Sequence, residues 1–213
     1  MKDIKARATA IFDILRNEYP KAEPALNYNS AFQLLIATIL SAQCTDARVN
    51  LVTEELFKKY KTPKDFISVS NEELEKDIYS TGFYRQKAKS IKECCISLEE
   101  KYNGEVPEDF EKLTELRGVG RKTASVVAGN AFGIPAVAVD THVKRLSNLM
   151  GFINSTNPEK IEERIKELLP PADWVEASHW LATHGRNVCI ARRPKCFECK
   201  VSFLCPSAAG ENN

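Results

Sequence analysis

Apolar residues recur at helical spacing along nearly the whole chain, and this periodicity restricts the fold more than any other feature. Near the start, Ile4, Ala8, Ile11 and Leu15 share one face of an amphipathic helix. Equivalent patterns predict helices over 31–40, 46–60, 71–82, 85–102, 107–116, 123–131, 158–169 and 173–183. Only residues 136–139 resemble a strand, and that stretch is too short for periodicity to decide. The sequence therefore predicts an all-α fold.

The composition is that of an ordinary globular protein. Of the 213 residues, 43% are apolar and 28% are charged, which excludes a largely disordered chain. A chain of this length buries enough surface to fold without disulfides. The net charge of +1, from 30 Lys and Arg against 29 Asp and Glu, excludes a uniformly cationic nucleic-acid binder. A locally basic face remains compatible with that balance.

We expect no membrane segment and an intracellular location. The longest apolar stretch, residues 31–40, is interrupted by Gln33 and Thr38. It is far shorter than the roughly 20 residues that cross a bilayer. Charges are scattered through the first 15 residues, which is unlike a secretory signal.

A glycine turn separates two of the predicted helices, at Gly118-Val119-Gly120. Two glycines let the backbone adopt conformations closed to other residues and approach a ligand closely. The first N–H groups of the following helix, and its positive dipole end, suit a phosphate. A lone G-x-G is usually a simple helical turn. Here the flanking leucines and small residues fit the helix-hairpin-helix motif over about residues 113–131, which holds the DNA backbone without reading sequence.

Basic residues gather in three runs, each beside a special turn or cluster. A single run would be read as a solvated helix face. Three such runs favour a surface that faces phosphates. They comprise Arg85, Lys87, Lys89 and Lys92; then Arg117, Arg121 and Lys122; and finally Arg186, Arg192, Arg193, Lys195 and Lys200.

Two residues carry candidate chemistry. Lys122 stands at the start of a helix, where the dipole disfavours a cation, so we expect a lowered pKa and a nucleophilic amine. The alternative for Lys122 is a phosphate contact. Asp140 precedes a predicted helix and suits its N-cap, a role compatible with stabilising a cationic sugar. The sequence alone does not bring the two residues together.

Four of the seven cysteines are concentrated near the end of the chain. Their spacing is Cys189-x6-Cys196-x2-Cys199-x5-Cys205. An intracellular setting argues against a disulfide framework. Four thiolates can hold either zinc or a [4Fe–4S] cluster, and the spacing by itself leaves both open.

Together these segments resemble the endonuclease III family of bifunctional DNA glycosylases with abasic-site lyase activity. The likeness runs from about residue 10 to 205 and rests on 41–46, 116–124, 138–142 and the four cysteines. It implies a six-helix barrel domain over 23–135 that contains the hairpin. An iron–sulfur domain would combine 1–22 with 136–213. The active site would lie in the cleft between the two domains.

The resemblance also assigns roles to individual residues. Lys122 matches the Schiff-base lysine and Asp140 the catalytic aspartate; His142 belongs to the same motif, without an assigned step. Gln43 would fill the gap left by a flipped base, and Phe83 would be the apolar wedge, where Leu is more familiar. The other expected DNA contacts are Gly118, Val119, Gly120, Arg121, Arg192, Arg193 and Lys195.

The implied cofactor is a [4Fe–4S] cluster on the four C-terminal cysteines, with a mainly structural role. The implied substrate is duplex DNA that contains a damaged pyrimidine or an abasic site. The damaged base would be flipped out, removed by Lys122 and Asp140, and the strand cut by β-elimination. We expect a monomer that is cytoplasmic and nucleoid-associated if the host is a prokaryote.

Four alternatives remain. One is a mismatch thymine or uracil glycosylase of the same superfamily, against which Lys122 argues. An adenine glycosylase fits less well, because that type carries a further C-terminal domain and lacks this lysine. A non-catalytic helix-hairpin-helix module, or a zinc-binding interaction protein, would use the same residues only for binding and stability.

Overall fold

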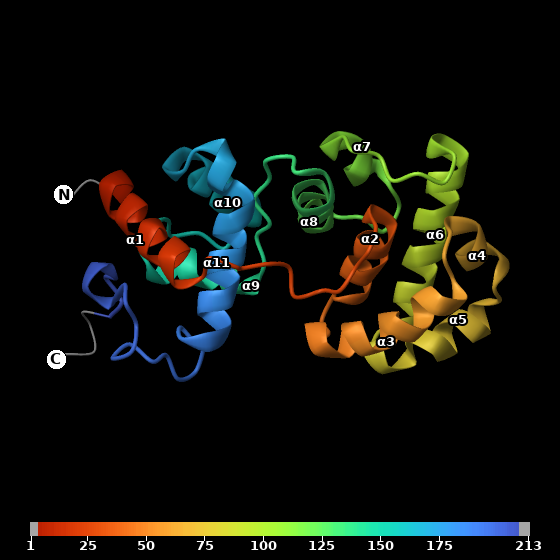
Figure 1. The fold of residues 1–213 in the computed structure, drawn as a ribbon, viewed down its shortest axis with the longest axis horizontal. Helices are drawn as coiled ribbons and strands as arrows, with labels where there is room; N and C mark the ends of the chain where they lie inside the picture. Colours follow the sequence, from red (N-terminus) through yellow and green to blue (C-terminus); the bar gives the residue numbers. More distant parts are fainter. Residues whose placement is uncertain (1–3, 209–213) are drawn as a thin grey trace. The chain divides into compact units, whose positions relative to one another are not determined.

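Residues 4–208 are described by a computed structural model, and the regular secondary structure in this range is helical (Figure 1). The described residues form 11 α-helices and three short 3-10 helices, with no strand. The predicted all-α fold is therefore confirmed. Residues 136–139, the one strand-like stretch, have no regular secondary structure.

The chain divides into two compact units. One unit is Pro24–Ile134, and the other combines the chain up to Glu23 with the chain from Pro135 onward. The continuous unit contains α2 (Ala31–Leu40), α3 (Asp46–Lys59), α4 (Pro63–Ser68), α5 (Asn71–Ile78), η1 (Tyr79–Thr81), α6 (Tyr84–Tyr102), α7 (Phe110–Glu115) and α8 (Arg121–Phe132). The discontinuous unit contains α1 (Ile4–Glu18), α9 (Thr141–Leu149), α10 (Pro158–Leu168), η2 (Pro171–Asp173), α11 (Trp174–Asn187) and η3 (Ser202–Leu204).

In the continuous unit, α2 is the central core helix. Ser30 caps it by accepting a hydrogen bond from the Gln33 amide, and eight of its ten residues are buried. It packs against α3, α6 and α8, while α6 also packs against α4 and α5. A helix that is apolar on all sides needs such surroundings to be removed from water.

The discontinuous unit has its own core, in which α1 packs against α10 and α11. The ring of Phe12 stacks on Phe152 with centroids 5.4 Å apart and lies 6.5 Å from Trp180. Arg7 in α1 donates hydrogen bonds to the carbonyls of Met150 and Gly151. The first helix of the chain is thereby tied to segments more than 140 residues away.

Capping residues account for the differences between predicted and observed helix bounds. The short helix α4 was not predicted; Thr62 and Asp65 form a capping box before its apolar residues. The helix predicted from residue 107 begins at Phe110, because Asp109 is its N-cap. Helix α5 starts at Asn71, as predicted, with Ser70 as its N-cap, and ends at Ile78 rather than at residue 82.

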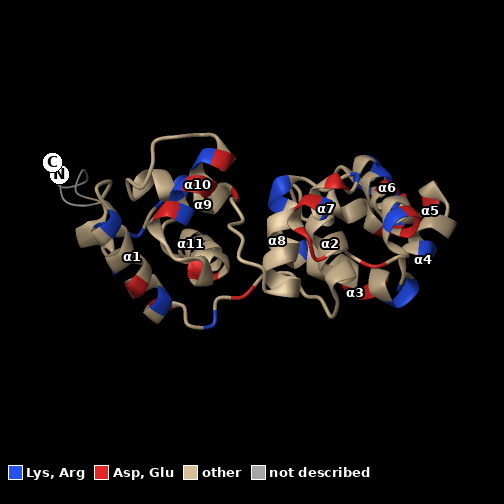
Figure 2. Cartoon of the chain, turned by 90° about the horizontal axis from the view of Figure 1, so that it is seen from above, with Lys and Arg blue, Asp and Glu red and all other residues tan. Residues whose placement is uncertain are grey.

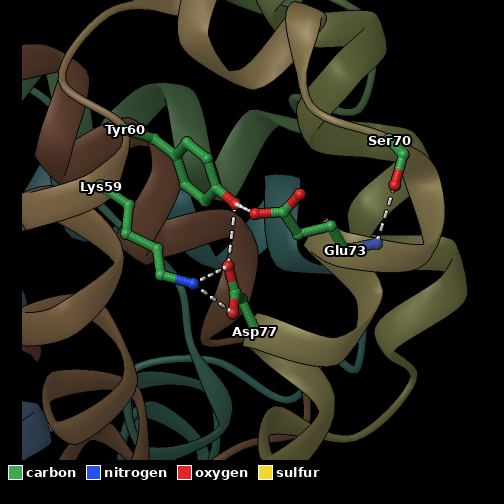
Figure 3. Close-up of polar contacts among 5 residues, drawn as sticks. All are labelled: Lys59, Tyr60, Ser70, Glu73 and Asp77. Carbon is green, nitrogen blue, oxygen red and sulfur yellow. Dashed lines mark hydrogen bonds and ion pairs between the residues drawn. The ribbon is translucent and has the colours of Figure 1, made fainter.

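A polar cluster joins the end of α3 to α5 (Figure 3). The Tyr60 hydroxyl donates to Asp77 at 2.8 Å and to Glu73 at 3.2 Å, and the Lys59 ammonium lies 2.9 Å from Asp77. Burial and the hydrogen bond to Asp77 raise the pKa of Tyr60. Because Asp77 lies two residues before η1, the cluster fixes the segment that leads into the Gly82–Phe83 turn.

No helix in residues 4–208 combines the length and the apolar character needed to cross a membrane.

Candidate functional site

The glycine turn lies between α7 and α8, as predicted, and its two glycines differ in what they require. Gly118 has a φ of +77°. A Cβ there would stand 2.8 Å from the Ser90 Cβ and 3.1 Å from the Ser90 carbonyl oxygen of α6. Gly118 is therefore needed both for its backbone conformation and for close packing. Between the glycines, Val119 is buried in the core.

Gly120 is the N-cap residue of α8 and supplies no side-chain hydrogen bond to the first turn. A Cβ at Gly120 would meet no atom within 4 Å. The site is open, and Gly120 has no side chain that could cap the first N–H groups of α8. An anion of phosphate type fits such a helix start.

Two basic residues lie in the first turn of α8, next to this helix start. Arg121 and Lys122 are both exposed, and Figure 2 shows basic residues at the end of α8 next to α7. The Arg121 guanidinium lies 5.1 Å from the ring centroid of Phe110. The hairpin therefore presents an open helix start after Gly120, an arginine held over an aromatic ring, and Lys122 on one helical turn.

The two glycines give a matched test of the hairpin. Gly118→Ala is expected to lower the free energy of unfolding by about 1–3 kcal/mol, because the added methyl is strained and clashes with Ser90. Gly120→Ala is expected to leave stability within about 0.5 kcal/mol. It should nevertheless weaken binding to duplex DNA, because its methyl stands in front of the helix start. Urea unfolding and fluorescence-anisotropy titration measure the two effects. A stable Gly118→Ala variant would contradict this account of the turn.

Gln43 and Phe83 share an unusual backbone conformation. Among residues 4–208, only three non-glycine residues have positive φ: Gln43 at 53°, Phe83 at 48° and Asn103 at 53°. Asn103 simply ends α6. Gln43 and Phe83 are both exposed, Phe83 to 65%. The left-handed conformation costs an ordinary residue about 1–2 kcal/mol, so strain is retained at both of these positions.

A buried lysine supports the Phe83 turn. The Lys87 ammonium donates to the Thr81 carbonyl at 2.8 Å, and its side chain is 4% exposed. Burial lowers the Lys87 pKa. Lys92 likewise donates to the Val69 carbonyl. The prediction that the whole run Arg85–Lys92 faces phosphates is therefore wrong for these two lysines, which bind backbone carbonyls.

An exposed aromatic group beside Phe83 was not predicted. Tyr79 is 64% exposed, and its ring centroid lies 4.8 Å from that of Tyr84. The Arg85 guanidinium lies 5.6 Å from the Tyr84 centroid. In the sequence, the aromatic residues on both sides of Thr81–Phe83 were the signal that could have indicated this exposed group. Together these residues form a surface suited to stacking.

Asp140 is the N-cap of α9, as predicted. Its Oδ1 accepts a hydrogen bond from the Val143 amide at 2.7 Å. The side chain is partly exposed. Asp140 belongs to the discontinuous unit and Lys122 to the continuous one, and their joint action stays a prediction.

His142 packs within its own unit. A Cβ on Gly185 would stand 2.8 Å from the His142 Nδ1, so glycine is what allows α9 to approach α11 here. Burial lowers the His142 pKa, opposed by Asp140 and reinforced by Arg145 and Arg186. The structure gives His142 a packing role, while its DNA contact stays a prediction.

The four C-terminal cysteines line one small pocket of about 30 Å³ with apolar neighbours that include Leu149, Met150 and Val201. Burial raises the pKa of the Cys189 and Cys199 thiols, so a bound metal must displace their protons. Within residues 4–208, no three or more His, Cys, Asp or Glu side chains have the arrangement that holds a metal ion. A shared pocket with four soft sulfur donors fits a metal–sulfur site.

The loop between the cysteines carries the remaining predicted contacts. Arg192 and Arg193 are exposed, and Lys195 lies 3.7 Å from Glu198. The Lys195 amide donates to the Val188 carbonyl at 2.9 Å, which ties the loop to the end of α11. Arg145 donates to the Cys189 carbonyl at 2.7 Å. The basic loop is thus fixed at its base.

Comparison with known proteins identifies relatives of the entire chain. Residues 36–171 match the HhH-GPD superfamily of base excision DNA repair proteins. Endonuclease III of Synechocystis sp. is 50% identical over 209 residues, which is 98% of this chain and 95% of that protein.

Solved structures agree with this assignment. A trapped endonuclease III–DNA covalent intermediate superposes with a TM-score of 0.95 at 44% identity, covering 98% of this chain and 99% of that one. A thermostable thymine-DNA glycosylase is more distant, with a TM-score of 0.86, 25% identity and coverage of 96% and 98%. By sequence, fold and length, the chain belongs to the endonuclease III family of the HhH-GPD superfamily.

Proposed function

We propose that this protein is a base excision repair enzyme that removes oxidised pyrimidines from duplex DNA and then cleaves the abasic strand. The observation that carries the proposal is the exposed Lys122 in the first turn of α8, directly after the glycine turn whose second glycine is the N-cap of that helix. Phosphate binding at this helix start would bring a nucleophilic amine next to the DNA backbone. A relative in this family has been trapped covalently on DNA.

In the proposed reaction, the Lys122 amine attacks C1′ of the damaged nucleotide and the base leaves. Asp140 stabilises the positive charge on the sugar and accepts a proton from the attacking amine. The C1′–O4′ bond then breaks, which opens the sugar ring, leaves a C4′ hydroxyl and gives a Schiff base. The Schiff base withdraws electrons, so a C2′ proton is lost and the 3′ phosphate leaves by β-elimination. Lys122 is released when water hydrolyses the imine.

Base flipping must precede this chemistry, and Gln43 and Phe83 are proposed to drive it. Both are exposed on strained turns, where they can enter the stack that the damaged base vacates. The Lys87–Thr81 hydrogen bond holds the Phe83 turn in place. Tyr79, Tyr84 and Arg85 extend the same surface and are proposed to lie along the DNA beside Phe83.

The strain at Phe83 predicts that two substitutions there differ in stability while both lower activity. Phe83→Gly should be about 1 kcal/mol more stable than Phe83→Ala, because glycine adopts positive φ without penalty. Both variants should excise an oxidised pyrimidine more slowly than the unchanged protein, since neither can wedge into DNA. Thermal unfolding and single-turnover excision assays measure these effects. Equal stability of the two variants would show that the turn carries no strain.

We propose a [4Fe–4S] cluster on Cys189, Cys196, Cys199 and Cys205, with zinc as the alternative. The shared apolar pocket and the four thiols support a metal–sulfur group. Bound there, the group would cross-link the loop that carries Arg192, Arg193 and Lys195 and so order it for phosphate contact. Iron and sulfide analysis and visible absorption of the purified protein distinguish the cluster from colourless zinc.

A second candidate function is excision of thymine or uracil from mismatches. The likeness to a thymine-DNA glycosylase favours it, although at lower identity than the endonuclease III relatives. Excision from duplexes with thymine glycol, G·T or G·U, compared at equal enzyme concentration, decides between the two. We expect thymine glycol to be processed fastest.

We propose that the protein acts on genomic DNA, which in a bacterium lies in the nucleoid.

A further inference from the structure

One of the four cysteines faces a buried imidazole. The His184 side chain in α11 is 3% exposed, and both of its ring nitrogens have partners. Its Nε2 lies 3.4 Å from the Cys199 Sγ, and its Nδ1 lies 3.0 Å from the Tyr19 hydroxyl. All three residues belong to the discontinuous unit. They form a continuous hydrogen-bonded path from the end of α1 to a proposed metal ligand.

The chemistry of the groups fixes which atom carries each proton once Cys199 binds a metal. A metal-bound cysteine is a thiolate, which only accepts hydrogen bonds. A neutral imidazole has one N–H donor and one acceptor nitrogen, and the Tyr19 hydroxyl can donate its proton to the ring nitrogen that faces it. The proton of the neutral ring therefore sits on Nε2 and points to Cys199, while Tyr19 donates to Nδ1.

Neighbouring contacts hold this path in position. Lys200, next to Cys199, forms an ion pair with Glu18, next to Tyr19. Arg7 donates to the Leu204 carbonyl at 3.1 Å. Helix α1 is thus fixed to the C-terminal segment at two points, through Arg7 near its start and Glu18 at its end. Tyr19 and His184 also meet edge to face, with ring centroids 6.0 Å apart.

Cys205 has a different environment from Cys199. Its Sγ lies 3.5 Å from the Leu149 carbonyl oxygen, which has no hydrogen to offer to a thiolate. A donor to one sulfur withdraws charge from the metal group, and this stabilises its reduced form. The hydrogen bond at Cys199 therefore affects the reduction potential of the bound group as well as its position.

We infer that His184, oriented by Tyr19, is a positioning residue that donates a hydrogen bond to the Cys199 thiolate and raises the reduction potential of the bound iron–sulfur cluster. The inference rests on the proposed [4Fe–4S] content. It requires no DNA and no catalytic turnover, so it is tested separately from the proposed repair activity.

The experiment measures the one-electron midpoint potential of the purified holoprotein by film voltammetry, and its Fe–S(Cys) stretching frequencies by resonance Raman. Three variants change the path: Tyr19→Phe removes the orienting hydroxyl, His184→Leu removes the donor, and His184→Gln keeps an N–H group. Tyr28→Phe is the matched control, because its hydroxyl binds the Asn130 carbonyl at 3.2 Å in the other unit. Iron is quantified in every sample.

The midpoint potential is expected to fall in Tyr19→Phe and to fall further in His184→Leu, with a rise in the Fe–S(Cys) frequencies. His184→Gln should stay closer to the unchanged protein, and Tyr28→Phe should match it. Unchanged potentials in iron-loaded Tyr19→Phe and His184→Leu would overturn the inference. If His184→Leu does not retain iron, the comparison of Tyr19→Phe with His184→Gln decides. An unchanged protein that contains zinc and no iron would overturn the cofactor proposal and this inference with it.

Discussion

Lys122→Ala is expected to abolish both base excision and strand cleavage, with a loss of at least about 10³-fold in the single-turnover rate on a thymine glycol duplex. The loss follows from removal of the nucleophile, and effects of this size are typical of covalent catalysis. The variant should fold normally, because Lys122 is exposed and lies outside the core. Single-turnover excision and thermal unfolding test the two parts of this prediction.

Two further variants separate catalysis from phosphate binding. Lys122→Arg keeps the positive charge and the reach of the side chain but provides no amine that forms a Schiff base. It should bind duplex DNA and remain inactive. Lys112→Ala removes another exposed lysine, from α7 of the same hairpin, and should retain activity. An active Lys122→Arg variant would mean that Lys122 is only a phosphate contact.

Asp140→Asn is expected to lower the excision rate by roughly 10²- to 10⁴-fold while leaving the protein stable. Asparagine caps helices as well as aspartate does, so the hydrogen bond to the Val143 amide at 2.7 Å can be kept while the charge is lost. Rates are measured under single-turnover conditions, and stability by urea unfolding.

Asp140→Ala provides the comparison, because it removes the cap together with the charge. It should be about 1 kcal/mol less stable than Asp140→Asn and no more active. If Asp140→Asn retained full activity, Asp140 would be a helix cap alone. The two variants thus separate the contribution of the Asp140 side chain to stability from its contribution to the excision rate.

Local sequence signals predicted the helices and the hairpin because those features depend on near neighbours. Periodic apolar residues gave the helical fold, and the glycine turn gave the start of α8. Capping decided where α7 begins: Asp109 is its N-cap, so the helix starts at Phe110 and not at residue 107. The spacing of Cys189, Cys196, Cys199 and Cys205 indicated a shared site, and all four line one pocket.

Other features depend on contacts between distant segments, for which no local pattern of residues exists. Lys87 reads as a surface lysine, yet the fold buries it against the Thr81 carbonyl. His184 reads as a core residue, and only the packing of α1 reveals its contact with Tyr19. The strain at Gln43 and Phe83 is likewise invisible in the sequence, because neither residue type indicates a left-handed backbone conformation.

Borohydride trapping tests the central claim, that Lys122 attacks the sugar of a damaged nucleotide, most directly. The protein is incubated with a duplex that contains a single thymine glycol, reduced with borohydride, digested, and the cross-linked peptide is mapped by mass spectrometry. Parallel reactions contain an abasic site, a G·T pair or a G·U pair. We predict a covalent complex on thymine glycol whose DNA remnant maps to Lys122, and no complex with Lys122→Ala. Intact DNA binding without a trapped complex on any of these duplexes would contradict the Schiff-base mechanism. It would indicate instead that the protein is a non-catalytic DNA-binding module.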